Sequence, residues 1–203
     1  MNSKSQKDDY TNKQEIFKNI DEKSNITKGQ KIKRELIDII KTIVIAIVVA
    51  FIITNFIIVN AIVPTGSMKD TIMPNDRLIA FRLSYLFSSP QRGDIVVFKA
   101  PDDEETLYVK RIIGMPGETI NILDGKVYID DNEQPLNDEY IMEKMLGSFG
   151  PYVVPENSYF MLGDNRNDSQ DSRYWKNAFL PEDNILGKAI FKYYPKIEPL
   201  WNK

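Results

Sequence analysis

No feature constrains this chain more than the stretch from Thr42 to Met68, in which 27 consecutive residues carry no charge. Of the 22 residues from Thr42 to Val63, 18 are apolar. As an α-helix these residues would extend roughly 33 Å, which is enough to cross a lipid bilayer. A buried core helix rarely lacks charge over such a length, and a cleaved signal peptide usually has a shorter apolar region that ends in small residues. We therefore expect a permanent transmembrane anchor over residues 36–63.

The cations around this anchor predict its orientation. Four Lys or Arg side chains lie shortly before the uncharged stretch that begins at Thr42, whereas Lys69 is the one cation within about a dozen residues after the anchor. Because basic flanks stay on the cytoplasmic side, residues 1–35 should form a mobile cytoplasmic tail. Residues 64–203 should then form an extracellular domain of a single-pass protein of the cell membrane. The four preceding cations are Lys31, Lys33, Arg34 and Lys41.

Residues 64–203 alternate short apolar runs with turn residues, which is typical of β-strands. Asp124-Gly125, between two β-branched runs, is the clearest hairpin turn. We predict a mostly β, antiparallel domain with a small β appendage at about residues 118–156. The predicted strands cover residues 77–81, 94–98, 107–113, 119–122, 126–129, 159–162 and 189–194.

The composition excludes several kinds of chemistry, because the chain contains no histidine and no cysteine. Disulfide frameworks, thiolate zinc sites, cysteine nucleophiles and Ser-His-Asp triads all need these side chains. The net charge of −3 disfavours nucleic-acid binding, which requires a clustered positive surface. Any catalysis must therefore use hydroxyl, carboxylate, amine or backbone groups, and we expect neither a metal nor another cofactor.

Two segments carry side chains that could act together. Ser67 directly follows the apolar stretch, where a loop serine could be a helix N-cap or a nucleophile. Lys110 lies in the predicted strand 107–113, so one cation of the pair Lys110 and Arg111 should point with Tyr108 among apolar neighbours. A lysine in that setting loses hydration, which lowers its pKa and provides a neutral amine as a general base. The simpler interpretation is that Lys110 extends to water.

A third segment, residues 163–173, is dense in short polar side chains. It could form a solvated loop or a network of hydrogen bonds that stabilise turns. It does not fit a calcium loop, because Arg166 stands where an oxygen ligand would be required. The acidic run 102–105 is interpreted as a solvated loop rather than a metal site. We therefore predict no metal site in this chain.

Four motifs, in this order, resemble the type I signal peptidases of bacteria. They are PTGSMKDTI (64–72), RGDIVVF (92–98), YVKRIIGMPGE (108–118) and GDNRNDSQDSR (163–173). The single anchor and the modest length are similar to the shorter enzymes of Gram-positive bacteria. The resemblance implies a membrane-bound serine endopeptidase that cleaves N-terminal signal peptides from exported preproteins, with an antiparallel β catalytic domain after one transmembrane helix.

The resemblance also implies roles for individual residues. Ser67 would be the nucleophile and Lys110 the general base. The related peptidases of the endoplasmic reticulum have histidine in place of this lysine, so a chain without histidine agrees with the bacterial type. The backbone N–H of Ser67 and the hydroxyl of Thr65 would stabilise the oxyanion. Ser169 would orient the lysine.

Two ion pairs are implied as well, and they would hold the 163–173 segment against the site. One joins Asp171 to Arg173, and the other joins Asp164 to Arg111. The partners would be the lipid bilayer and a signal peptide, bound as an extended strand with small residues at the first and third positions before the cut. The apolar walls that select these small residues would be Val63, Met68, Ile72 and Val109.

Two other interpretations fit parts of the sequence. A self-cleaving Ser/Lys repressor of related fold should be soluble and carry an N-terminal DNA-binding helix-turn-helix, which the anchor disfavours. A non-catalytic β module on a membrane stalk would make Ser67 and Lys110 dispensable.

Overall fold

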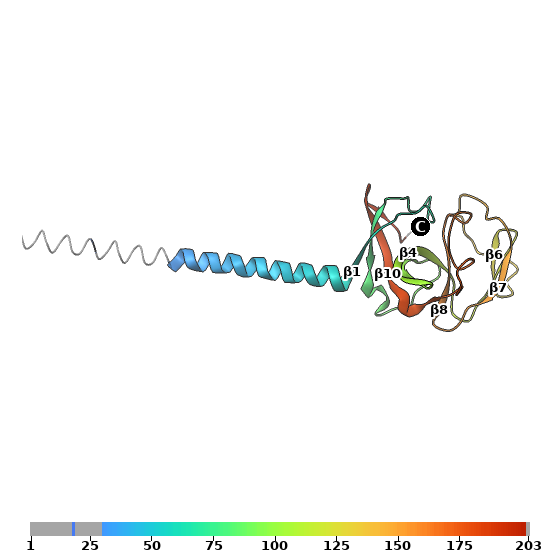
Figure 1. Ribbon diagram of the computed structural model, residues 1–203, viewed down its shortest axis with the longest axis horizontal. Helices are drawn as coiled ribbons and strands as arrows, with labels where there is room; N and C mark the ends of the chain where they lie inside the picture. The colour runs from blue at the N-terminus through green and yellow to red at the C-terminus, as the bar shows by residue number, and fades with distance from the viewer. Residues whose placement is uncertain (1–17, 19–29, 202–203) are drawn as a thin grey trace, which may run out of the picture. The chain divides into compact units, whose positions relative to one another are not determined.

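The structure is a computed structural model, which describes Lys18 and residues 30–201 (Figure 1). The predicted tail therefore lies outside the described residues, apart from Lys18 and residues 30–35. The chain divides into two compact units, residues 1–51 and residues 52–203.

One helix, Gln30–Ile57, is long and apolar enough to cross a membrane, and none of its apolar window is buried within the protein. Its last segment, η1 (Ile53–Ile57), is π-helical, and the backbone becomes extended at Ile58. The anchor predicted over residues 36–63 was thus too long as a helix, because Ile58–Ile62 form strand β1. The apolar run did not reveal where the helix ends, because β1 is apolar as well: Val59 and Ala61, on alternate positions of this strand, are buried in the core of the second unit.

Eight strands form the larger sheet, in which every pairing is antiparallel. Their spatial order is β1-β2-β10-β3-β4-β8-β9, with β11 paired to β10. The fold class predicted from the sequence is confirmed. Besides β1, the strands are β2 (Arg77–Phe81), β3 (Ile95–Ala100), β4 (Asp103–Gly114), β8 (Ser158–Leu162), β9 (Leu180–Pro181), β10 (Ile185–Tyr194) and β11 (Glu198–Pro199), with short 3₁₀ helices η2 (Arg82–Tyr85) and η3 (Glu182–Asn184).

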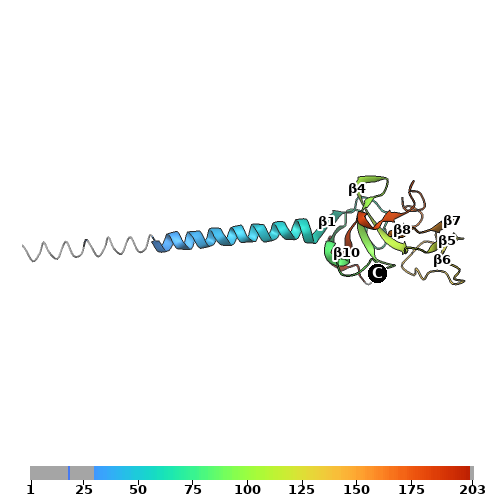
Figure 2. The ribbon, with the colours of Figure 1, turned by 90° about the horizontal axis from the view of Figure 1, so that it is seen from below.

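A separate three-stranded sheet lies within the range predicted for the appendage. Its order is β6-β5-β7, formed by β5 (Thr119–Leu123), β6 (Lys126–Ile129) and β7 (Phe149–Val153). Figure 2 shows these three strands together, beyond β8. The predicted hairpin turn joins β5 to β6, and both of its residues have positive φ, 48° at Asp124 and 78° at Gly125. A long connection without strands, residues 130–148, joins β6 to β7.

All seven predicted strands are present, and four further strands were not predicted. The unpredicted β7 contains Gly150-Pro151, which reads as a turn in the sequence. The strands β9 and β11 have only two residues each, which is too short for a periodic pattern.

The second half of strand β4, residues 109–114, is buried on both faces, and this places the two adjacent cations inside the protein. Val109 belongs to one hydrophobic cluster, Ile112 to a second and Ile113 to a third. The exposed fraction is 4% for Lys110 and 1% for Arg111. The prediction that one cation of the pair would lie among apolar neighbours was therefore incomplete, because both are buried.

Candidate active site

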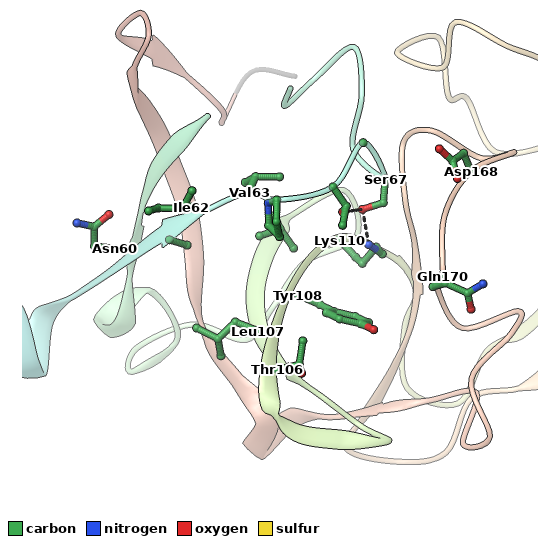
Figure 3. A pocket seen from close by; sticks show the side chains of 15 residues that line it. Asn60, Ile62, Val63, Ser67, Thr106, Leu107, Tyr108, Lys110, Asp168 and Gln170 are labelled. Atoms are coloured by element: carbon green, nitrogen blue, oxygen red, sulfur yellow. Dashed lines mark hydrogen bonds between the residues drawn. The ribbon is translucent and has the colours of Figure 1, made fainter. Parts of the chain in front are cut away.

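Ser67 and Lys110 meet in the interior of the second unit. Ser67 lies in the turn after β1, Lys110 lies in β4, and the Lys110 ammonium group donates a hydrogen bond of 2.6 Å to Ser67 Oγ (Figure 3). The alternative that Lys110 extends to water is therefore wrong. A serine hydroxyl within hydrogen-bonding distance of an amine is the geometry that a nucleophile and its base require.

The surroundings of Lys110 make its amine a weaker base than a free lysine. Burial lowers the pKa of Lys110 from 10.5 to about 8, although the carboxylates of Asp171 and Asp164 act in the opposite direction. The aromatic ring of Tyr108 lies 5.3 Å from the nitrogen. About one Lys110 in ten is therefore neutral at pH 7, and the neutral amine is the form that a general base requires.

The turn that carries Ser67 is held by backbone and side-chain contacts. The N–H of Ile72 donates to the carbonyl of Met68 at 2.7 Å. Asn165 binds the turn twice, since its backbone N–H donates to the Ser67 carbonyl at 3.0 Å and its side-chain amide to the Gly66 carbonyl at 3.0 Å. The catalytic loop, residues 163–173, thus fixes the backbone on both sides of the Ser67 nitrogen.

The first ion pair of the catalytic loop joins it to β4. Arg111 binds Asp164 with two hydrogen bonds, Nε to Oδ1 at 2.9 Å and Nη2 to Oδ2 at 2.6 Å. Asp164 Oδ2 also accepts a bond of 2.6 Å from the hydroxyl of Thr71, in the turn that follows Ser67. One carboxylate therefore links the strand of Lys110, the catalytic loop and the turn of Ser67.

The second ion pair lies within the catalytic loop. Arg173 donates from Nε and Nη2 to the two oxygens of Asp171, both at 2.8 Å. Asp171 Oδ2 also accepts from the N–H of Gly163 at 3.0 Å, and Arg173 Nη2 also donates to the Arg166 carbonyl at 2.6 Å. These bonds close the loop between its first and last residues.

Two further hydroxyl groups predicted for the site lie beside Ser67. The Thr65 hydroxyl donates to Ser67 Oγ at 3.4 Å. The Ser169 hydroxyl is buried and has no hydrogen-bond partner in the described part of the chain, so the expected bond to Lys110 is absent. A Cβ at Gly163 would come within 2.2 Å of Ser169 Oγ and 2.4 Å of the Ser67 carbonyl oxygen, so glycine is required for these serines to approach each other.

A cavity of about 510 Å³ opens at the serine and lysine. It is lined by residues 60–67, by residues 106–110 of β4, and by Asp168 and Gln170 of the catalytic loop. Of the four apolar wall candidates, Val63 and Val109 line it, whereas Met68 and Ile72 are fully buried in the core. Sequence reasoning missed Asp168 and Gln170, whose position follows only from the folding of the loop.

Two open strand edges border this cavity. Among the described strands, β1 pairs with β2 alone, so its other edge is open to a further strand. β4 pairs with β8 only through residues 111–114, so the same edge of residues 106–110 has no partner strand in the described part of the chain. Figure 3 shows Ile62 and Val63 on one side of the cavity and Leu107 and Tyr108 on another. An extended peptide could form backbone hydrogen bonds with either edge.

Among the described residues, no group of three or more acidic side chains is placed to hold a metal ion.

Comparison with known proteins identifies the family of this chain. A family model described as signal peptidase, peptidase S26, matches residues 36–194. Signal peptidase I of Leptolyngbya laminosa is 40% identical over 173 residues, which cover 81% of this chain and 83% of that protein. Signal peptidase I of Rickettsia typhi is 32% identical over 194 residues, covering 69% and 73% respectively. A crystal structure of a signal peptidase I from Enterococcus faecalis shares 34% identity, with a TM-score of 0.43 over 50% of this chain and 97% of that one. The chain belongs to the S26 family of signal peptidases and is a serine endopeptidase.

Proposed function

We propose that this chain removes N-terminal signal peptides from exported preproteins, using Ser67 as the nucleophile and Lys110 as the general base. The observation that carries this proposal is the 2.6 Å hydrogen bond between the buried Lys110 nitrogen and Ser67 Oγ. Since the chain has no histidine or cysteine, pairs that use an imidazole base or a thiolate nucleophile are not available to it.

The proposed reaction begins with transfer of the Ser67 proton to neutral Lys110. Ser67 Oγ attacks the carbonyl carbon of the scissile bond, and the Lys110 ammonium then protonates the leaving amine. Water hydrolyses the resulting ester of Ser67, with Lys110 again accepting the proton. Peptide-bond cleavage is completed when Ser67 is released.

Two donors could stabilise the oxyanion of the tetrahedral intermediates. The backbone N–H of Ser67 forms no hydrogen bond to another described residue, so it is available to a substrate oxygen. The Thr65 hydroxyl reaches the same region, which supports it as the second donor. Ser169 remains the hydroxyl proposed to orient Lys110, although it forms no hydrogen bond with Lys110 in this structure.

The proposed substrate binds as an extended strand at the open edges of β1 and β4. Val63 and Val109 would then limit the size of the residues at the first and third positions before the cut. A signal peptide ends in such small residues. The Gram-positive type of the family remains a proposal from the motif resemblance, since the curated relatives above come from a cyanobacterium and a Rickettsia.

We further propose that the Gln30–Ile57 helix anchors the enzyme in the cell membrane with the N-terminus in the cytoplasm. The domains would then be a tail that precedes Gln30, the anchor helix, and an extracellular catalytic domain from Ile58 to residue 203, so the tail predicted over residues 1–35 is shortened by the first turns of the helix. Anchoring would keep Ser67 near the membrane surface, where the apolar helix of a signal peptide ends, and so raise its effective concentration.

The proposed orientation predicts the result of surface proteolysis. Protease added to intact spheroplasts should degrade the domain after residue 63 and spare an epitope tag at the N-terminus, because the cationic flank keeps that end inside. Immunoblotting for the two ends measures this, with detergent-lysed cells as the control in which both are degraded. Protection of the catalytic domain in intact spheroplasts would overturn the orientation.

The proposed function predicts both cleavage and its pH dependence. The purified full chain in detergent should cleave a preprotein after its signal peptide, with log kcat/KM rising with pH and levelling off above about 8, where Lys110 is neutral. Initial rates over the range from pH ~5 to ~10, with mass spectrometry of the product, measure this.

An acid limb near pH ~4, the ordinary range of a carboxyl group, would identify Asp or Glu as the base and contradict the role of Lys110. Lack of cleavage at every pH would contradict the function itself.

A further inference from the structure

The connection between β6 and β7 reaches the active site although it contains no strand. Its residues 138–146, here called the strap, touch the catalytic loop at two points and β4 at one. The strap is fixed at its far end, because Met145 is buried in the core of the small sheet and the N–H of Gly125 donates to the Gly147 carbonyl at 3.1 Å. It therefore offers a rigid support to the segments that it touches.

The first contact is with Arg166 of the catalytic loop. Arg166 Nη1 binds Asp138 Oδ2 at 2.8 Å, and its Nη2 donates to the hydroxyl of Tyr140 at 3.4 Å. The Arg166 side chain is 1% exposed, whereas that of Asp138 is 28% exposed. Since a buried guanidinium needs a compensating carboxylate, Asp138 of the strap keeps this part of the loop folded inward.

The second contact is with the neighbour of the proposed base. The ring of Tyr140 lies 4.1 Å from the guanidinium carbon of Arg111, which directly follows Lys110 in β4. A cation so close to an aromatic face gains stabilisation that increases when water is excluded. Tyr140 thus restrains the residue that also binds Asp164 of the catalytic loop.

The third contact is made through Asn167, which precedes Asp168 and Ser169. Its side-chain oxygen accepts from the Leu146 N–H at 2.9 Å, and its amide group donates to the Lys144 carbonyl at 3.1 Å. A paired contact of this kind fixes both the position and the direction of the loop backbone.

We propose that the strap positions the active site, with Asp138 and Tyr140 acting as positioning residues that hold the catalytic loop and β4 around Ser67 and Lys110. This inference depends on the proposed function. The strap contacts involve Arg111, which directly follows Lys110, and Arg166 and Asn167, which lie three and two residues before Ser169. A connection that served only to link β6 to β7 would need none of them.

Loosening the strap should raise the pKa of Lys110 by allowing water to reach its amine. The groups that face Lys110 are the Ser67 hydroxyl, the Tyr108 ring and the carboxylates of Asp164 and Asp171. None of them belongs to the strap, so its loss removes no charge beside the amine. If the loop moves outward, water reaches Lys110 and the desolvation that lowers its pKa is reduced.

The test compares Asp138→Asn, Tyr140→Leu and Asn167→Ala with the matched variant Glu139→Gln. Glu139 lies in the strap but is exposed, and its side chain forms no hydrogen bond or ion pair with the described residues. The first three variants each break a contact between the strap and its neighbours and are here called the strap variants. They should lower kcat for a preprotein about tenfold with little change in KM, because displacement of reacting groups by ~1 Å can cost ~100-fold. The acid limb of kcat/KM should move to higher pH, and Tyr140→Phe, which keeps the ring, should recover most of the activity lost in Tyr140→Leu.

A second readout does not depend on turnover. The Lys110 Cε resonance of the full chain in detergent, assigned by its loss in Lys110→Met, should titrate at higher pH in the strap variants than in Glu139→Gln. Asp138 is partly exposed and Asn167 is exposed, so Asp138→Asn and Asn167→Ala should fold. These two variants test the proposal if Tyr140→Leu does not fold. The same titration and the same acid limb in all variants would overturn the positioning role. Failure of the unaltered protein to cleave preproteins would contradict the proposed function alone, and the titration would still decide the role of the strap.

Discussion

Ser67→Ala and Lys110→Met are each expected to reduce preprotein cleavage by at least ~10⁴-fold, because residues that transfer one proton act as a unit. For the same reason, the double variant should be no less active than either single variant. Initial rates with a preprotein substrate, followed by the loss of the precursor band and appearance of the mature band, measure the effect.

The matched control for the lysine variant is Lys69→Met, because Lys69 is close to Ser67 in sequence but exposed. It should retain near-normal turnover. Lys110→Met should also fold at least as well as the unaltered protein at neutral pH, since burial of the ammonium opposes folding below the folded-state pKa of about 8. Near-normal activity in either single variant would show that Ser67 and Lys110 are not the catalytic pair.

Asp164→Ala is expected to lower the free energy of unfolding by about 3–5 kcal/mol, because it leaves the Arg111 guanidinium buried without its counter-ion. The exposed fraction is 1% for both side chains of this pair, so water cannot replace the lost carboxylate in the folded protein. Chemical denaturation of the full chain in detergent, followed by tryptophan fluorescence, measures the change.

Asp168→Ala is the matched control, because Asp168 belongs to the same loop but is exposed and forms no ion pair among the described residues. Its effect on stability should remain within about 0.5 kcal/mol. A loss below about 1 kcal/mol in Asp164→Ala, typical of an exposed pair, would mean that the Arg111 pair does not hold the loop.

The periodicity and the turn residues were sufficient to predict most of the catalytic domain. The strands around Lys110 and in the β5-β6 hairpin are recovered because each has β-branched alternation between strong turn signals. The transition at Ile58 was not predictable in this way, because a helix exposed to lipid and a strand with one face in a core are both apolar. The pairing of Ile58 with Phe81 depends on a distant segment, which local sequence does not encode.

The candidate site was predictable only in part. The order of the motifs predicted that Ser67, Lys110 and the two arginine–carboxylate pairs belong to one site. In the structure Lys110 binds Ser67, and each arginine binds its predicted carboxylate. The separation of Met68 and Ile72 from the cavity was not predictable, because an apolar residue in a site motif can face either the substrate or the core. The strap was missed because Asp138 and Tyr140 lie in a polar connection whose sequence resembles any solvated loop.

The strand β1 also determines where the catalytic part of the molecule can be separated from its membrane segment. A soluble fragment that began after residue 63, where the apolar run ends, would lack the edge strand that pairs with β2 over five positions from Ile58 to Ile62. It would also lose one wall of the cavity and expose Leu78 and Ala80, which are fully buried in the intact domain. A fragment that begins at Ile58 keeps this strand and omits the helix, so crystallisation and inhibitor screening should start from that residue.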